Sequence, residues 1–311
     1  MAPVVRVVVV SRPGDGHGDS VCAELEERGA LVWRISLNTY MTTSLAWELG
    51  QGLFVENEQG HLEVPFGAAA YYRRPGWAAP AVVDPHEAAA LSEEADAQFF
   101  GLLEALDLRW LDSPPAVRRA ELKLHQLQVA RNIGLATPLS NLTNIRRTAE
   151  RFASAGPTVV KAVGPGTIES PEGARPVHTA AFSGRDDLLR AVEICPVLLQ
   201  SRLEVRTDVR ITTVAGKAFV AVRPRSPDEP LDWREVDPEG KDFRVDSDPE
   251  LSSHALSVAE HLGIRFSAQD WVVTDEGPVF LEANPAGQWL FLPDEIASAI
   301  TSSIADALLA P

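Results

Sequence analysis

The chain has 311 residues, of which 45% are hydrophobic and 23% charged, and its formal net charge is −16. This length and composition predict a large core and more than one lobe, while the charge argues against nucleic acid or an anionic membrane as a partner. Cys22 and Cys195 offer neither a metal-ligand spacing nor a disulfide framework, which fits a reducing cytoplasm. The N-terminal apolar run is short and ends in a glycine-rich turn, so it predicts neither a secretory signal nor a membrane span.

Residues 1–113 predict an α/β domain with a parallel sheet. The β-branched run from Val4 to Val10 is typical of a strand buried on both faces. The loop SRPGDGHGD follows it, then a helix for which Asp19 is the expected N-cap, and then the strand LVWRIS; this order favours parallel pairing. The strand AAAYYRRPGW and a helix from His86 to Leu106 complete the domain before Pro114-Pro115.

Two motifs in this first domain leave a choice open. The string PGDGHGD imitates a nucleotide loop, but it lacks the third, helix-opening glycine of a dinucleotide fingerprint. We therefore interpret it as a turn in which His17 is solvated. The string YYRRPGW is either a patch that faces a peptide or a strand end whose arginines are solvated or paired with the acidic face.

Residues 114–195 predict a second, central lobe. One helix is expected from Ala116 until Gly134, and another begins with Asn144 as its N-cap. The strand TVVKAV carries Lys161 inside an apolar run, and the loop Gly164-Pro165-Gly166 follows it with backbone amides that could close over phosphates. A hairpin around SPEGA and the helix GRDDLLRAVEIC complete this lobe.

Residues 196–311 predict a third lobe that is mostly antiparallel. Hairpins are expected around Ala215-Gly216 and Glu276-Gly277, where each turn separates two β-rich runs. A polar excursion rich in proline and glycine and a helix lie between the two hairpins. A last helix is expected to start near Pro293.

Carboxylate and amide side chains gather on the last hairpin. In VFLEANPAGQWLF, Glu282 and Asn284 are two residues apart and therefore share one face of a strand. Asp270 lies on the strand that is expected to pair with it, so the three side chains can converge. Such oxygen ligands suit Mg²⁺, which prefers one or two carboxylates together with phosphate oxygens and water. The alternative is a polar strand end with solvated side chains.

Basic residues supply candidate partners for an anion. An unpaired buried ammonium is costly, so Lys161 either reaches a partner or pocket or extends to water at a sheet edge. Lys123 on its own is typical of a surface lysine. Asp208 and Arg210 share one strand face, where Arg210 could stabilise an oxyanion or form a cross-strand ion pair. Weaker candidates of the same kind are Arg223 and Arg234.

The order of these motifs resembles the ATP-grasp fold, an α/β and α+β architecture. Lys123, Lys161 with its glycine loop, LLQSRLE, DVR, QDWVV and LEANPAGQW succeed one another as in proteins whose two α+β subdomains grip ATP behind an N-terminal Rossmann-like domain. More narrowly, YYRRPGW, DVR, LDWR and NPAGQW resemble the graspetide synthetases, microviridin-type ligases that cyclise ribosomal precursor peptides, in their actinobacterial branch. The resemblance spans nearly the whole chain, and E-x-N-P-x-G-Q-W is its most specific string.

The resemblance implies nucleotide and metal contacts. The lysines and the glycine loop would bind the phosphates of ATP, the hinge after the central lobe would contact adenine, and Glu204 would contact the ribose. Gln200 stands where many ATP-grasp enzymes have Glu. The implied nucleotide-binding residues are Lys123, Lys161, Gly164, Gly166, Gln200, Ser201, Leu203 and Glu204. The implied Mg²⁺ ligands are Asp270, Glu282 and Asn284.

The resemblance also implies a reaction and a partner. Arg210, oriented by Asp208, would lie near the reacting carboxyl, with Arg223 and Arg234 as further candidates. ATP would phosphorylate an Asp or Glu side chain of a ribosomal precursor peptide, and a Ser/Thr hydroxyl or Lys amine would then attack to form an ester or amide. On the helix GRDDLLRAVEIC, the side chains that would meet basic leader residues, or else cap the helix, are those of Asp186 and Asp187. A homodimer is expected from the family likeness alone.

Two other functions fit the same motifs. The first is a different ATP-grasp ligase, which joins amino acids to a small acid or to a protein tail and would share every phosphate and metal residue. The second is a non-catalytic scaffold that binds nucleotide and presents a leader peptide to another enzyme. The complete set of Asp270, Glu282, Asn284 and Arg210 argues against a scaffold, which has no need of it.

Overall fold

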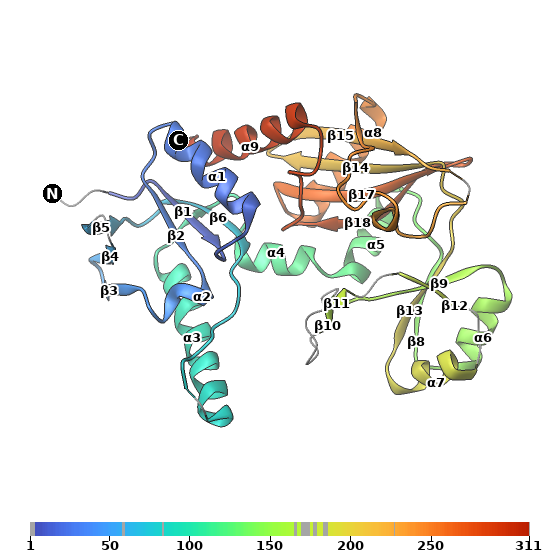
Figure 1. Cartoon of the computed structure of the whole chain (residues 1–311), viewed down its shortest axis with the longest axis horizontal. Coiled ribbons are helices and arrows are strands. Elements are labelled where there is room, and N and C mark those ends of the chain that lie inside the picture. The colour runs from blue at the N-terminus through green and yellow to red at the C-terminus, as the bar shows by residue number, and fades with distance from the viewer. Residues whose placement is uncertain are drawn as a thin grey trace.

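The computed structural model describes residues 4–57, 60–82, 84–164, 167–168, 175–176, 179–182, 186–226 and 228–310. Figure 1 shows three bodies in chain order: an N-terminal lobe in blue, a central lobe in green and yellow, and a C-terminal lobe in orange and red. The helix α4 (Pro114–Ala120) crosses from the first body towards the other two. Domain boundaries at residues 113 and 195 stay a prediction.

The N-terminal lobe is built on a parallel sheet with strand order β2-β1-β6-β7, as the strand–helix–strand pattern predicted. All five residues of β1 are buried, because the sheet has a layer on each side. The strands of this sheet are β1 (Val7–Ser11), β2 (Val32–Ile35), β6 (Ala69–Arg74) and β7 (Arg109–Trp110). The other elements are α1 (Gly16–Glu27), α2 (Leu37–Tyr40), α3 (Pro85–Ala105) and the antiparallel strands β3 (Ser44–Glu48), β4 (Gly52–Asn57) and β5 (Gly60–Val64).

Two helix starts differ from the sequence predictions. Asp15, not Asp19, is the N-cap of α1, so Asp19 lies inside the helix and pairs with Arg34 on β2. The helix α6 (Arg146–Ser154) has Ile145 as its N-cap and lacks a capping side chain, so the prediction of Asn144 was wrong. Asp19 and Asn144 are residue types that often cap helices, and both lie near a helix start. In each case, however, the helix begins at a different residue, so residue type alone did not predict its first position.

The central lobe has an antiparallel sheet with strand order β12-β9-β13-β8. A small core that includes Ala149 of α6, Leu189 and Val192 of α7, and Leu199 packs the two helices on this sheet. The strands are β8 (Ser140–Thr143), β9 (Thr158–Lys161), β12 (Ala180–Phe182) and β13 (Val197–Ser201), and α7 is Asp186–Ile194. A separate ribbon pairs β10 (Thr167–Ile168) with β11 (Arg175–Pro176).

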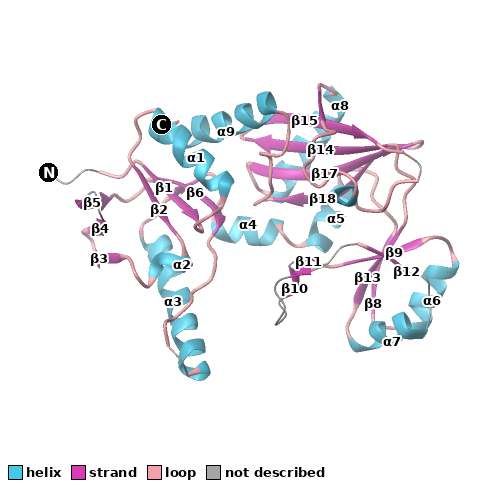
Figure 2. Cartoon of the chain, in the orientation of Figure 1, coloured by secondary structure: helices cyan, strands magenta, loops and turns pink. Residues whose placement is uncertain are grey.

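The C-terminal lobe has a five-stranded sheet with order β16-β15-β14-β17-β18, and both predicted hairpins are present. Its strands are β14 (Thr207–Val214), β15 (Lys217–Pro224), β16 (Arg244–Asp246), β17 (Phe266–Thr274) and β18 (Gly277–Asn284). A short 3₁₀ helix (Trp233–Glu235) lies in the excursion between β15 and β16. The helices α8 (Pro249–Leu262) and α9 (Asp294–Leu309) cover the sheet (Figure 2).

The helix that was expected from Ala116 to Gly134 is divided in two. The segment Glu121–Leu122 separates α4 from α5 (Lys123–Asn132). Ala120, Val129 and Ala130 pack in the same core as residues of α8, β14 and β17. Lys123 therefore begins a helix that lies against the C-terminal sheet, although its place in the chain is next to the central lobe.

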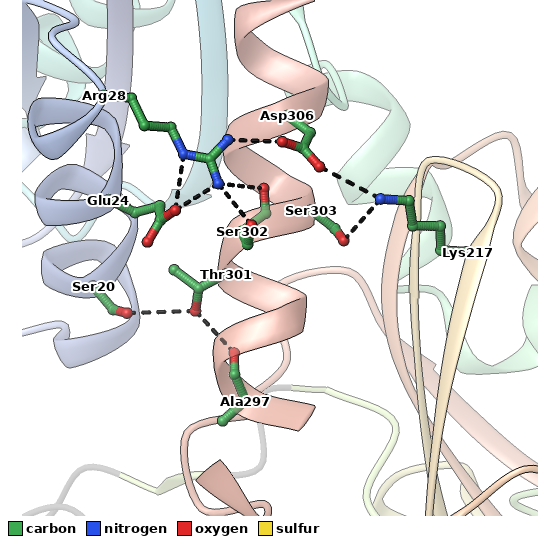
Figure 3. Close-up of polar contacts among 9 residues, drawn as sticks. All are labelled: Ser20, Glu24, Arg28, Lys217, Ala297, Thr301, Ser302, Ser303 and Asp306. Carbon is green, nitrogen blue, oxygen red and sulfur yellow. Dashed lines mark hydrogen bonds and ion pairs between the residues drawn. The ribbon is translucent and has the colours of Figure 1, made fainter. Parts of the chain in front are cut away.

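The N-terminal and C-terminal lobes meet along α1 and α9. Arg28 on α1 contacts Asp306 on α9 at 2.7 Å, and Lys217 on β15 contacts the same carboxylate at 3.4 Å (Figure 3). Ser20 and Thr301 face one another across the same interface at 3.4 Å. The last helix, α9, therefore connects the C-terminal sheet to α1, the first helix of the chain.

Within the described residues, the structure contains no helix that is both long enough and apolar enough to cross a membrane.

Candidate active site

The predicted metal ligands lie on neighbouring strands. Asp270 on β17 is directly across from Glu282 on β18, and Asn284 is two residues further along the same face. The amide of Asn284 donates to Glu282 Oε1 at 3.3 Å. The hairpin register therefore brings together the carboxylates and the amide that the sequence singled out.

Both predicted phosphate lysines reach this carboxylate. Lys123 Nζ at the start of α5 lies 3.1 Å from Glu282 Oε2, and Lys161 Nζ on β9 lies 3.2 Å from the same atom. Burial would raise the pKa of Glu282, but Lys161, Lys123 and the Asn284 amide outweigh it and hold that pKa well below its ordinary value. Glu282 is therefore an anion, and Lys161 is neither unpaired nor at a solvated sheet edge.

Gln126 fixes the backbone between the two ligands on β18. Its amide nitrogen donates to the carbonyl of Ala283 at 2.6 Å, and its oxygen accepts the N–H of Ala283 at 3.0 Å. The side chain is buried and lies one helical turn after Lys123, so α5 presents both groups to β18. The sequence analysis missed Gln126, although a polar residue three positions after a functional lysine was a visible signal.

Arg210 pairs with the predicted metal ligand Asp270, at 2.5 Å between Nη1 and Oδ1. Its Nη2 donates to the carbonyl of Gln288 at 3.2 Å, and its guanidinium lies 5.5 Å from the ring centre of Phe291. The side chain is only 6% exposed, so it is held in one place by contacts on three sides. This arrangement leaves Arg210 next to the carboxylate group that would bind Mg²⁺.

Asp208 does not orient Arg210, which corrects the sequence interpretation. Its carboxylate instead accepts from Arg223 at 3.1 Å and from Arg225 at 3.3 Å. Arg223 also contacts Glu229 at 2.8 Å and Asp237 at 3.7 Å, so it ties the excursion after β15 to the sheet. Asp208 and Arg210 share a strand face, but each pairs with an oppositely charged residue on a neighbouring strand. The partner of Asp208 lies on β15, and the partner of Arg210 lies on β17.

A cavity of about 610 Å³ opens between the central and C-terminal lobes beside these groups. It is lined by the segment that follows β13, by strands β17 and β18, and by the loop between β15 and β16. The predicted site residues that line it are Lys161, Gln200, Ser201, Leu203, Glu204, Asp208, Arg234, Asp270 and Glu282. A cavity of this size suits a small organic ligand such as a nucleotide.

The remaining predicted residues have mixed positions. Lys123, Asn284, Arg210 and Arg223 contact residues of the lining without lining the cavity themselves. Gly164 is exposed three residues after the end of β9, and Gly166 lies outside the described residues. Asp186 and Asp187 begin α7, and their side chains lie outside the description. Their predicted contacts with a leader peptide stay untested.

Sequence reasoning missed two arginines near the site. Arg225 lines the cavity and pairs with Asp208, but it stands in a polar stretch where a solvated residue is the ordinary expectation. Arg73 of the YYRRPGW string is buried and pairs with Asp15 at 2.7 Å, so it is neither solvated nor paired with the acidic helix face. His17 is half-buried rather than solvated, and its ring lies 4.5 Å from that of Trp289.

The donor set fits Mg²⁺ bound together with phosphates. Asp270, Glu282 and Asn284 present hard oxygen atoms from one sheet face, and the ammonium groups of Lys123 and Lys161 lie beside them. Two carboxylates and an amide are too few to enclose a metal alone, which suits an ion that keeps water and takes phosphate oxygens. The two lysines at present neutralise the carboxylate that would face the metal.

No protein-family model matches the chain. Among curated proteins, the probable alpha-L-glutamate ligases of Legionella pneumophila strains Corby and Lens are each 23% identical to it over 189 residues. The match covers 58% of this chain, and it spans 61% of the length of each relative.

Solved structures match over the whole chain. A Chryseobacterium gregarium RiPP-associated ATP-grasp ligase, solved with ADP and a leader and core peptide, has a TM-score of 0.86 and 23% identity, with 100% of this chain and 98% of that one covered. The macrocyclase MdnC from Microcystis aeruginosa, bound with the precursor peptide MdnA, has a TM-score of 0.83 and 23% identity, with 98% and 99% covered. A RimK domain protein from Sphaerobacter thermophilus has a TM-score of 0.60 and 17% identity, with 98% and 100% covered. The chain therefore has the ATP-grasp fold, as the order of its motifs predicted.

Proposed function

We propose that the protein is an ATP-dependent ligase that cross-links side chains of a ribosomal precursor peptide. One observation carries the proposal: Lys161 from the central lobe and Lys123 from α5 converge on Glu282, which faces Asp270 at the edge of a nucleotide-sized cavity. Cations and hard anions in this arrangement suit the transfer of a phosphoryl group from ATP, where positioning and charge neutralisation supply most of the catalysis.

The proposed reaction has two steps. A carboxylate oxygen of an Asp or Glu side chain attacks the γ-phosphorus of ATP. The bond from that phosphorus to the β,γ-bridging oxygen breaks, so ADP leaves and the side chain becomes an acyl phosphate. A Ser/Thr hydroxyl or a Lys amine then attacks the acyl carbon, loses its proton and expels phosphate, so each cross-link removes one water from the peptide overall. Mg²⁺, when bound, would neutralise charge on the β- and γ-phosphates.

Residues of this chain supply the remaining functions. Lys123 and Lys161 would hold the phosphates, while Arg210 would face the developing charge on the carboxyl side of the transfer. The hinge from Gln200 to Glu204 lines the cavity and would contact the adenosine part of ATP. No enzyme nucleophile takes part in this scheme.

The choice of a peptide substrate is supported by the pattern of similarity. The Chryseobacterium ligase and MdnC, which were solved with a leader and core peptide and with a precursor peptide, match this chain at TM-scores of 0.86 and 0.83, against 0.60 for the RimK domain protein. The similarity to them includes the N-terminal lobe, since 100% and 98% of this chain are covered. A leader-binding role for α7, a homodimer and a cytoplasmic location belong to the same proposal.

A second candidate is a ligase that adds glutamate to a small acid or a protein tail. The match to the probable alpha-L-glutamate ligases favours it, and such an enzyme would use the same phosphate and metal residues. The two activities leave different products, because cross-linking removes water from one chain, whereas ligation adds an amino acid residue to an acceptor.

Mass spectrometry tests the proposal directly. The protein is incubated with Mg²⁺, ATP and a short Thr-, Asp- and Glu-rich precursor encoded beside its gene, and intact masses are followed over time. The proposal predicts the loss of one water per cross-link and an equal number of ADP molecules released. A mass gain that equals a glutamate residue would support the second candidate, and nucleotide binding without turnover on any peptide would support a scaffold.

A further inference from the structure

Four side chains hold four consecutive residues of the loop that follows β18. Arg74 Nη2 donates to the carbonyl of Ala286 at 3.3 Å, Arg73 Nη1 to that of Gly287 at 2.7 Å, and Arg210 Nη2 to that of Gln288 at 3.2 Å. The N–H of Trp289 points to His17 Nδ1 at 3.5 Å. We call residues 286–289 the clamped loop. Three of its four partners come from the N-terminal lobe, more than 200 positions away in the chain.

At the centre of these contacts is a buried ion pair. The side chain of Arg73 is fully buried, and its Nε donates to Asp15, whose side chain is 3% exposed. The guanidinium also lies 5.0 Å from the ring centre of Trp289. Buried ion pairs give up hydration on both partners, and a well-packed apolar pair of similar volume would often be as stable. This argues that the pair fixes a geometry rather than adding stability.

His17 takes part as a neutral acceptor. Burial, together with the positive charge of Arg73, lowers the pKa of His17 to about 4. Its ring is therefore uncharged at neutral pH, and Nδ1 can accept the N–H of Trp289. Trp289 itself is fully buried, and its indole N–H donates to Thr301 on α9 at 3.0 Å. The loop thus has one anchor in the core and one in the N-terminal lobe.

The clamped loop has little freedom to shift without moving the site. The N–H of Gly287 donates to the carbonyl of the metal-ligand residue Asn284 at 3.0 Å. A Cβ atom on Gly287 would lie only 2.4 Å from the Cβ of Ala268, the residue that pairs with Asn284 across the hairpin. Gln288 contacts Arg210 directly, so a displaced loop would move a metal ligand and the catalytic arginine together.

We propose that Arg73 and His17 are positioning residues for the ligase site: from the N-terminal lobe they hold the clamped loop, which sets the places of Asn284 and Arg210. The role in catalysis rests on the proposed function, whereas the role in holding the loop does not. The strings PGDGHGD, YYRRPGW and NPAGQW then have one shared role, because the hydrogen bonds that hold the clamped loop connect residues of all three.

The first test measures amide hydrogen exchange in the protein without nucleotide or metal. Arg73→Lys keeps the charge but cannot contact Asp15 and Gly287 with two separate nitrogens. Peptides that cover residues 284–292 should exchange about tenfold faster than in the wild type, because hydrogen bonds to charged groups are among the stronger ones. The matched control is Arg28→Lys, which alters a contact between the same two lobes that includes no residue of the clamped loop, and exchange of this peptide should stay unchanged.

A second pair of variants covers the case in which Arg73→Lys fails to fold. His17→Asn places a carbonyl oxygen near the position of Nδ1 and should keep wild-type exchange, whereas His17→Phe removes the acceptor and should speed exchange of the same peptide severalfold. Wild-type exchange in both Arg73→Lys and His17→Phe would overturn the proposal. The proposal would also be overturned if Arg28→Lys sped exchange of this peptide as much as Arg73→Lys does. The association of the two lobes in general would then explain the faster exchange in both variants.

The second test measures turnover with the precursor peptide. In Arg73→Lys and His17→Phe, kcat should fall by roughly 10- to 100-fold, the usual range for groups that orient metal ligands, while KM for ATP changes less than about threefold. His17→Asn should restore kcat. A faster-exchanging loop with unchanged kcat would overturn the positioning role. If the wild type itself links no peptide but the loop loosens as expected, the proposed function fails and the holding of the loop stands.

Discussion

Lys161 Nζ and Glu282 Oε2 lie 3.2 Å apart, although one belongs to the central lobe and the other to the last strand of the C-terminal lobe. Both residues line the cavity, and their contact places a cation and an anion where, in the proposed function, the phosphates of ATP and a metal ion would meet. Lys123 reaches the same oxygen from a third element, α5. The site is thus assembled from three segments that are distant in sequence and that only the fold brings together.

The first prediction concerns the phosphate contacts. Lys161→Met should raise KM for ATP by about tenfold or more, because it removes a charge-assisted contact to a phosphate and leaves Glu282 with one ammonium partner. Steady-state ADP release measures the change. Lys217→Met is the control, since that lysine contacts Asp306 on the surface at 3.4 Å. Equal KM values for the wild type and Lys161→Met would remove Lys161 from the nucleotide site.

The second prediction concerns Arg210. Arg210→Ala should keep nucleotide affinity within a few-fold and lower the rate of peptide dehydration by about 10²- to 10³-fold, the range found when one group that stabilises transition-state charge is removed. Calorimetry with an ATP analogue and mass spectrometry of the peptide separate the two effects. Arg28→Ala serves as the control for arginine removal away from the cavity. Normal dehydration by Arg210→Ala would refute its catalytic role.

The third prediction concerns stability. Arg223→Met leaves the nearby carboxylates of Asp208, Glu229 and Asp237 without their shared cation, so the free energy of unfolding should fall by about 3–5 kcal/mol. Arg206→Met removes an exposed pair with Asp275, which water and salt screen, and should change the free energy of unfolding far less than Arg223→Met does. Urea unfolding measures both. If both variants changed the free energy of unfolding by a similar small amount, the ion pairs of Arg223 would not contribute to stability as predicted.

The fourth prediction concerns pH. Asp112 accepts the backbone N–H groups of Arg265 and Phe266 at 2.6 and 2.8 Å, and burial raises its pKa from 3.8 to about 7. Between about pH 4 and 7 the unfolded chain has released this proton while the folded chain keeps it, so this group makes stability fall as pH rises through that window. Above pH 7 its contribution is constant.

Unfolding in urea between pH 5 and 8 tests this sign. Asp112→Asn should be less sensitive to pH than the wild type across the window, because the titrating group is absent. The amide of the variant keeps only one of the two acceptor oxygens, which lowers stability at every pH, so the slope with pH and not the absolute stability is compared. An identical slope in both proteins would show that Asp112 does not carry the effect.

Local patterns predicted much of the fold. The β-branched run forms the fully buried β1 from Val7 onward, whereas Val4 is exposed and lies outside the strand. The turns at Ala215-Gly216 and Glu276-Gly277 became hairpins. The period of two along a strand also predicted that Glu282 and Asn284 share a face opposite Asp270. These features depend on residues that are close in the chain or joined by a short turn.

Contacts between distant segments could not be predicted in the same way. Asp208 and Arg210 suggested one pair by their spacing, yet each found a closer partner on a neighbouring strand. Arg73 and His17 looked solvated because nothing in their own strings reveals that residues 286–289 pack against them. Pairing of this kind is decided by tertiary geometry, which the local pattern does not contain.

The central claim is that magnesium-bound ATP lies between the two lysines and the ligands on β17 and β18. A crystal structure with Mn²⁺ and a non-hydrolysable ATP analogue tests it most directly, because the anomalous signal locates the metal. The account predicts the metal on Asp270, Glu282 and Asn284, with the terminal phosphates against Lys123 and Lys161. A triphosphate bound elsewhere, with Glu282 still paired to both lysines, would contradict it.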